Sequence, residues 1–172
     1  MTKDTKMKIL DLGCQNNKIP GAIGVDICKN TQADVIHDFE VFPYPFEADS
    51  IDKVYAKHII EHLNNPKGFI KEIHRILKPG GEVFLETPHF SNYVAYSEPE
   101  HKHFYSYYTF NRLISDADFK IDIQELTFYK TFRFFGIKML ANKFPEQYER
   151  FWTYLFPAEN IVVKLVKKGK KH

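Results

Sequence analysis

Short apolar segments, most of them closed by a glycine or an acidic residue, alternate with turns through the first ninety residues of the chain. These segments occupy residues 8–12, 21–27, 33–37, 51–56 and 82–87. Between the last two, residues 68–77 carry apolar side chains at helical spacing, and Pro66 suits a first helical position. Strand patterns that alternate with helical patterns indicate an α/β fold with a mostly parallel sheet.

The pattern changes after Pro88. Residues 108–116 predict a helix, residues 119–128 a strand, residues 132–156 helix with a break at Pro145, and residues 160–166 a last strand. Of the 27 aromatic residues, 20 lie between Phe90 and Phe156. This block predicts either a lid over a flat acceptor or core plus a dimer face. Basic residues interleave with the aromatics, which leaves a membrane-surface role open: Lys130, Arg133, Lys138 and Lys143.

Length and composition indicate one cytoplasmic globular domain. The chain has 172 residues, 44 % hydrophobic and 27 % charged, which is ordinary for a soluble protein with a single core. No apolar run approaches the roughly 18 residues that span a membrane, and the polar first residues do not resemble a secretory signal. Two cysteines are too few for a disulfide scaffold. Residues 1–172 are therefore expected to form one unit, with a ligand-binding half at 1–90 and a second, capping half at 91–172.

Polar residues follow the predicted strands at the point where each one ends. Asp11 and Gly13 close the first strand, Asp26 the second and Asp38 the third. Ligands of open parallel sheets bind at these carboxyl ends. A carboxylate there can accept both ribose hydroxyl protons, Asp38 could accept from a purine amine, and Ile27 and Phe39 offer apolar faces. Carboxylates without a phosphate-binding lysine disfavour a phosphate ligand and favour a nucleoside that carries a sulfonium and an ammonium group.

Several segments together resemble class I S-adenosylmethionine-dependent methyltransferases of the "type 11" group. These segments are KILDLGC, GAIGVDI, FPYPFEADSIDKVYAKHIIEHL and EIHRILKPGGEVFLETPHF, in family order over residues 8–90. The resemblance implies a Rossmann-like seven-stranded sheet whose last strand lies antiparallel beside the fifth. It also implies S-adenosylmethionine as cofactor. Its contacts would be Asp11 and Gly13 at the methionine end, Asp26 and Ile27 at the ribose and adenine, Asp38 and Phe39 at the adenine edge and face, and His58 beneath the sulfonium.

The chain departs from this family after the first strand. Gln15 replaces the usual glycine after DLGC, and residues 15–21 are too few for a crossover helix. We expect that helix to be reduced to a turn. A dinucleotide enzyme is disfavoured, because the chain has no GxGxxG motif.

A second group of polar residues follows the fifth strand in the segment PHFSNYVAYSEPEHKHF. We expect it to overhang the transferable methyl group, with His89, His101 and His103 as candidate general bases. Two alternatives stay open: the histidines satisfy loop carbonyls, or they bind a metal with a glutamate. H-x-H spacing can chelate, but nothing in the sequence fixes a third ligand, so no metal site is predicted. His62 and His74 are expected to be surface or core residues of helices.

These observations predict methyl transfer from S-adenosylmethionine to a small-molecule acceptor. One alternative is a methyltransferase-fold protein, weakly active or inactive, that works through binding and dimerisation. A third is an RNA methyltransferase, although a net charge of +2 does not favour nucleic acid. The basic C-terminal residues are interpreted as a solvated tail: Lys164, Lys167, Lys168, Lys170 and Lys171.

Overall fold

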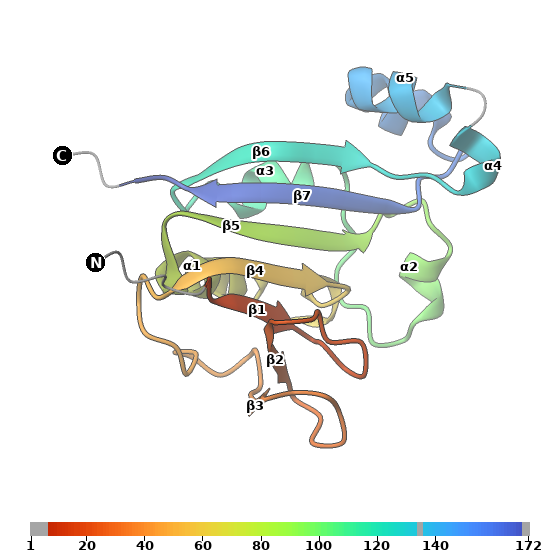
Figure 1. Cartoon of the computed structure of the whole chain (residues 1–172). Coiled ribbons are helices and arrows are strands. Elements are labelled where there is room, and N and C mark those ends of the chain that lie inside the picture. The colour runs from red at the N-terminus through yellow and green to blue at the C-terminus, as the bar shows by residue number, and fades with distance from the viewer. Residues whose placement is uncertain (1–6, 134–135, 170–172) are drawn as a thin grey trace.

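The structure, a computed structural model, describes residues 7–133 and 136–169. One seven-stranded sheet runs through both halves of the chain in the order β3-β2-β1-β4-β5-β7-β6 (Figure 1). Its strands are β1 (Ile9–Leu12), β2 (Ile23–Asp26), β3 (Val35–Ile36), β4 (Ile51–Lys57), β5 (Leu77–Pro88), β6 (Phe119–Leu126) and β7 (Asn160–Lys167). Strands β1 to β5 are parallel, and β7 lies antiparallel between β5 and β6. The predicted seven-stranded sheet with an antiparallel last strand is confirmed.

The helices are short and lie mostly in the second half. They are η1 (Ile60–His62), α1 (Pro66–Ile76), α2 (Val94–Ser97), α3 (Thr109–Leu113), α4 (Lys130–Arg133), α5 (Ile137–Lys143), α6 (Pro145–Gln147) and the π-helical turn η2 (Tyr148–Trp152). Helix α1 begins where the Asn65 side chain accepts a hydrogen bond from the Gly68 N–H at 2.8 Å. Its apolar stripe of Phe69, Ile70, Ile73 and Ile76 is buried against the sheet. No helix among the described residues is long and apolar enough to cross a membrane.

Only one face of the sheet is covered by helices. Figure 1 shows α1 and α3 behind the sheet and no helix across its front. The connections from β1 to β4 contain no helix. The crossover helix of the family between β1 and β2 is therefore reduced to a turn in this chain, as predicted. Both faces of a parallel sheet are normally covered by its crossover helices, and a short connection cannot supply one.

The uncovered face is stabilised by paired charges instead. Glu82 of β5 contacts Lys53 of β4 at 2.9 Å and Lys164 of β7 at 2.8 Å, and Lys164 reaches Asp122 of β6 at 3.0 Å. Beside them the rings of Tyr55 and Phe84 stack at 4.9 Å. The opposite face carries the aliphatic core, so the strands alternate between core and charge.

Three local predictions need correction. Strand β5 begins at Leu77 rather than at residue 82, because Leu77 already pairs with Ile51 across an irregular register. The helix predicted at 108–116 spans only Thr109–Leu113. The segment predicted as helix over 132–156 is interrupted at Phe144, before Pro145, as predicted, but it is also interrupted at Gly136, which is left-handed (φ 69°). Residues 134 and 135 lie outside the described range.

The C-terminal lysines that the structure describes form ion pairs, so the prediction of a solvated tail is wrong for these residues. Lys164 and Lys167 belong to β7, and Lys167 Nζ is buried against Asp49 Oδ1 at 2.6 Å and the Leu77 carbonyl at 2.8 Å. Lys168 Nζ contacts Asp118 Oδ1 at 2.7 Å. Lys170 and Lys171 lie outside the described residues.

Candidate active site

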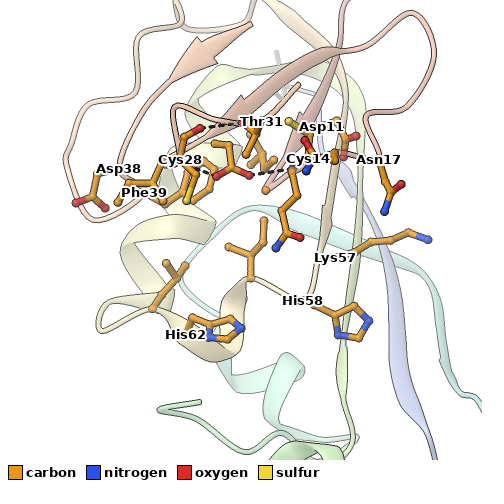
Figure 2. A pocket seen from close by; sticks show the side chains of 18 of the residues that line it. Asp11, Cys14, Asn17, Cys28, Thr31, Asp38, Phe39, Lys57, His58 and His62 are labelled. Atoms are coloured by element: carbon orange, nitrogen blue, oxygen red, sulfur yellow. Dashed lines mark hydrogen bonds between the residues drawn. The ribbon is translucent and has the colours of Figure 1, made fainter. Parts of the chain in front are cut away.

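A pocket of about 1340 Å³ opens at the carboxyl edge of the parallel strands. Its upper wall in Figure 2 comes from the turns after β1, β2 and β3, and its lower part holds His58 and His62. All seven residues that the resemblance assigned to the cofactor line it: Asp11, Gly13, Asp26, Ile27, Asp38, Phe39 and His58. The residues named from the strand ends therefore share one pocket, and their contact with a cofactor stays a prediction.

Asp11 and Gly13 form the part of the wall that follows β1. The buried Asp11 carboxylate accepts a hydrogen bond from the Ile19 N–H at 2.8 Å. Burial raises the pKa of this carboxyl, opposed by the Ile19 N–H and the Lys57 charge. Gly13 is left-handed (φ 67°), and a Cβ at this position would lie 2.5 Å from Ile59 Cδ1. Only glycine fits both the backbone angle and the close approach of Ile59.

Asp26 ends β2 and is only 5 % exposed. Its Oδ2 accepts from the Gln15 N–H and its Oδ1 from the Cys28 N–H, both at 2.9 Å. Each carboxylate oxygen has two lone pairs, so each keeps capacity for a ligand hydroxyl. The neighbouring Ile27 is 57 % exposed, an apolar side chain at the pocket wall.

Asp38 and Phe39 follow β3, and they contribute differently to the pocket wall. The Asp38 Oδ1 accepts from the Glu40 N–H at 2.9 Å, which leaves Oδ2 available at the pocket. Phe39 is 8 % exposed and packs edge-on against Phe69 at 6.1 Å. Most of the Phe39 ring therefore belongs to the core, and Ile27 is the more exposed apolar surface here.

His58 lies just past β4 with a left-handed backbone (φ 52°) and a half-exposed side chain. Its Nδ1 is 3.4 Å from Glu61 Oε1, and its Nε2 is 4.0 Å from Glu86 Oε1. The Glu61 carboxylate, helped by Glu86, raises the pKa of His58, while burial and Lys57 oppose the shift. A left-handed residue other than glycine stores strain, which is common at functional positions.

The three candidate bases occupy different environments. His89 is fully buried, with its ring nitrogens 2.7 Å from Ser91 Oγ and 3.1 Å from Glu149 Oε1, and it does not line the pocket. His101 packs its ring against His62, with centroids 4.6 Å apart. His103 lies farther along the same extended segment, 6.2 Å from the Tyr105 ring.

The predicted site left out several polar residues that line the pocket, among them His62, Glu100 and Lys102. Glu100 and Lys102 alternate with His101 and His103, and consecutive residues of an extended segment point to opposite sides. This alternation in the sequence indicated that one of the two pairs faces the pocket. Only the tertiary structure showed which pair it is.

The donor set fits a cationic nucleoside. Within the described residues Asp11, Asp26 and Asp38 form no ion pair with a lysine or arginine, although the Lys57 charge acts on Asp11 from farther away. A ligand with ribose hydroxyls, an ammonium and a sulfonium would satisfy them.

Residues 10–85 match the family described as a methyltransferase domain. A 45-residue segment is 44 % identical to a ubiquinone biosynthesis O-methyltransferase of Dictyostelium discoideum. That segment is 26 % of this chain and only 14 % of the relative's length.

Two solved structures show the same fold. A SAM-dependent methyltransferase from Archaeoglobus fulgidus superimposes with a TM-score of 0.67 at 18 % identity, over 94 % of this chain and 86 % of that one. A phosphoethanolamine N-methyltransferase of Haemonchus contortus in complex with S-adenosyl-L-methionine gives 0.61 at 19 % identity, over 95 % and 49 %. The chain has the fold of class I S-adenosylmethionine-dependent methyltransferases, and its residues 10–85 match the methyltransferase domain family. The cofactor of this class is S-adenosylmethionine.

Proposed function

We propose that the protein transfers a methyl group from S-adenosylmethionine to a small-molecule acceptor. The observation that carries the proposal is the buried Asp26 carboxylate at the end of β2, which faces the pocket beside the exposed Ile27. Asp26 would accept the ribose hydroxyls, and Ile27 would cover one face of the adenine. Asp38 would accept from the adenine amine, and Asp11 and Gly13 would hold the methionine end.

The cofactor supplies an electrophilic methyl group, so the protein's main task is placement of the acceptor in line with it. His58 would lie beneath the sulfonium, and His62, Glu100 and Lys102, which line the same pocket, would contact the acceptor. His101 and His103 remain candidate bases from the adjoining loop, and we assign His89 a structural role because it is enclosed by Ser91 and Glu149. The names of the partial curated relatives make an oxygen nucleophile the first acceptor class to screen.

Residues 1–172 are proposed to act as a single unit in the cytoplasm. The support is continuity of the sheet, since β6 and β7 of the second half pair with β5 of the first. The first half would bind the cofactor and the second would hold the acceptor.

Calorimetric titration with S-adenosylmethionine and S-adenosylhomocysteine tests the proposal. We expect micromolar binding of both, and a loss of at least about tenfold in Asp26→Asn, because one carboxylate oxygen becomes a donor. Asp34→Asn is the matched control, since Asp34 also bonds backbone in this region, at the Gly24 N–H, but does not line the pocket. No binding to the parent protein, checked by mass spectrometry for retained ligand, would contradict the proposal.

A second candidate function is a catalytically weak protein that acts through binding or dimerisation. The specific observation is the apolar surface of the last helical segment, where Phe151, Tyr154 and Leu155 are all at least 63 % exposed. Exposed aromatics in a cluster favour an interface. Sedimentation equilibrium of the parent and of Phe151→Ser/Tyr154→Ser distinguishes this case, because a dimer built on this surface dissociates only in the variant. RNA is not favoured, because Lys164, Lys167 and Lys168 are paired with carboxylates.

A further inference from the structure

Glu61, His62 and His101 meet at the edge of the pocket. One ligand atom from each lies within 4.8 Å of the others, among the residues that the structure describes. We propose that these three side chains form a binding site for a divalent transition-metal ion, of the class that takes two imidazoles and one carboxylate. The site differs from the histidine set considered from the sequence, because His89 is enclosed elsewhere and His62 takes its place.

The state of the His101 ring favours coordination. Its Nδ1 lies 2.9 Å from the backbone carbonyl oxygen of Ala95, which can only accept a hydrogen bond. Nδ1 therefore carries a proton, and in the neutral ring the lone pair lies on Nε2. This arrangement, in which a carbonyl orients a histidine through its second nitrogen, is the usual support of a metal-ligating imidazole.

The Glu61 carboxylate supplies the second and independent observation. Glu61 is 1 % exposed, and its Oε2 accepts from the Thr87 hydroxyl at 3.0 Å. Its Oε1 is buried and has no hydrogen-bond partner, with His58 Nδ1 at 3.4 Å as an ion-pair contact. An unsatisfied buried carboxylate oxygen is costly, and a cation would remove that cost.

The loop that carries His101 is held against the Glu61 segment. The Lys102 and His103 N–H groups donate to the Glu61 carbonyl at 2.8 and 3.1 Å. The buried Tyr105 hydroxyl donates to the Ile60 carbonyl at 3.1 Å. These bonds bring a histidine from the loop after β5 beside two adjacent ligands of η1 before any ion binds, so little conformational entropy remains to be lost.

The donor atoms restrict the type of ion. Two nitrogens and one oxygen suit Zn²⁺, Co²⁺, Ni²⁺ or Fe²⁺ better than Mg²⁺ or Ca²⁺, which prefer oxygen alone. At tetrahedral angles, bonds of about 2.0–2.2 Å place ligand atoms about 3.3–3.6 Å apart, so the three side chains must close by about 1 Å around the ion. Three protein ligands leave at least one position open for an external oxygen.

The position suggests what the open coordination site would hold. His62 lines the pocket together with Glu100 and Lys102, so the ion would sit at the wall of the space left for the acceptor. An oxygen-bearing acceptor could bind the ion there. The role of the ion in binding the acceptor rests on the proposed methyl transfer, whereas the metal site itself does not.

Titration of untagged, chelator-treated protein with Co²⁺ tests the site, because bound Co²⁺ has a visible absorption spectrum. We expect a single equivalent to bind, with competition by Zn²⁺. His101→Ala should weaken Co²⁺ binding by at least about tenfold. His103→Ala is the matched control, since it removes a histidine from the same loop and should leave Co²⁺ binding unchanged.

Three results would overturn the proposal. These are no Co²⁺ binding by the parent, equal binding by His101→Ala and the parent, and a sulfur-to-cobalt absorption band, which would assign the ion to Cys14 or Cys28. Glu61→Gln is a second variant, but it changes a buried residue, so thermal melting must first confirm folding. Asp26→Asn should lose cofactor binding and keep Co²⁺ binding, which separates failure of this site from failure of the proposed function.

Discussion

The side chain of Asp26 holds the backbone of Gln15, with its Oδ2 2.9 Å from the Gln15 nitrogen. This bond joins the end of β2 to the turn after β1, the connection that carries no crossover helix. Gln15 adopts φ 41° in this turn, a left-handed angle that glycine occupies at less cost. The short connection is therefore held by a carboxylate of the proposed cofactor site and contains a strained residue.

Gln15→Gly is expected to stabilise the protein slightly. Relief of left-handed strain, about 1–2 kcal/mol, exceeds the entropic cost of glycine, about 0.5–1 kcal/mol. The melting temperature should rise by up to about 4 °C. Gln15→Ala keeps the strain and serves as control, and an equal gain in both variants would show that the strain is not the cause.

Gly13→Ala should destabilise the protein more than Gly80→Ala. Both glycines are left-handed, at φ 67° and 79°, but only Gly13 faces Ile59, whereas Gly80 has open space. The difference should be about 1–3 kcal/mol in the free energy of unfolding, measured by urea titration. In the Gly13→Ala background, Ile59→Ala should cost less than in the parent. Additive losses would contradict the proposed contact.

Asp11→Asn should lose cofactor binding without losing stability. Burial raises the pKa of Asp11, so its charged form destabilises the folded state. This cost is present above the folded-state pKa of Asp11 and disappears as the pH falls below the unfolded-state pKa. Asparagine can still accept from the Ile19 N–H. Thermal melting should give Asp11→Asn a temperature at least equal to the parent's near neutral pH, with the difference vanishing in acid. A melting temperature of Asp11→Asn below that of the parent near neutral pH would contradict this prediction.

Lys164→Ala should lower the melting temperature more than Lys168→Ala. Lys164 bridges Glu82 and Asp122 on the uncovered sheet face, and its Nζ lies 5.5 Å from the centre of the Phe84 ring. Removing it leaves neighbouring carboxylates to repel each other. Lys168 forms one exposed pair with Asp118, so it is the matched control. Equal melting temperatures would mean that the charge pairs do not stabilise this face, and the effect of Lys164→Ala should shrink in high salt.

Strand ends were predictable because their signals are local. Asp11, Asp26 and Asp38 each follow an apolar run directly, and parallel strands bring their carboxyl ends to one edge whatever the connections are. The reduced crossover could also be read from the length of residues 15–21. Phe39 lines the pocket as expected, but its ring also packs against Phe69, and a short segment does not reveal which aromatic contributes to the core.

The sequence by itself determined the α/β class, the approximate positions of the strands along the chain and the carboxylates at their ends, because each depends on short-range pattern and chain length. Only the tertiary structure decided which histidines meet. His62 and His101 are far apart in the chain, and their contact depends on the hydrogen bonds that hold the loop after β5 against η1. The path of an irregular loop is set by such long-range bonds, and hydrophobic periodicity carries no information about them.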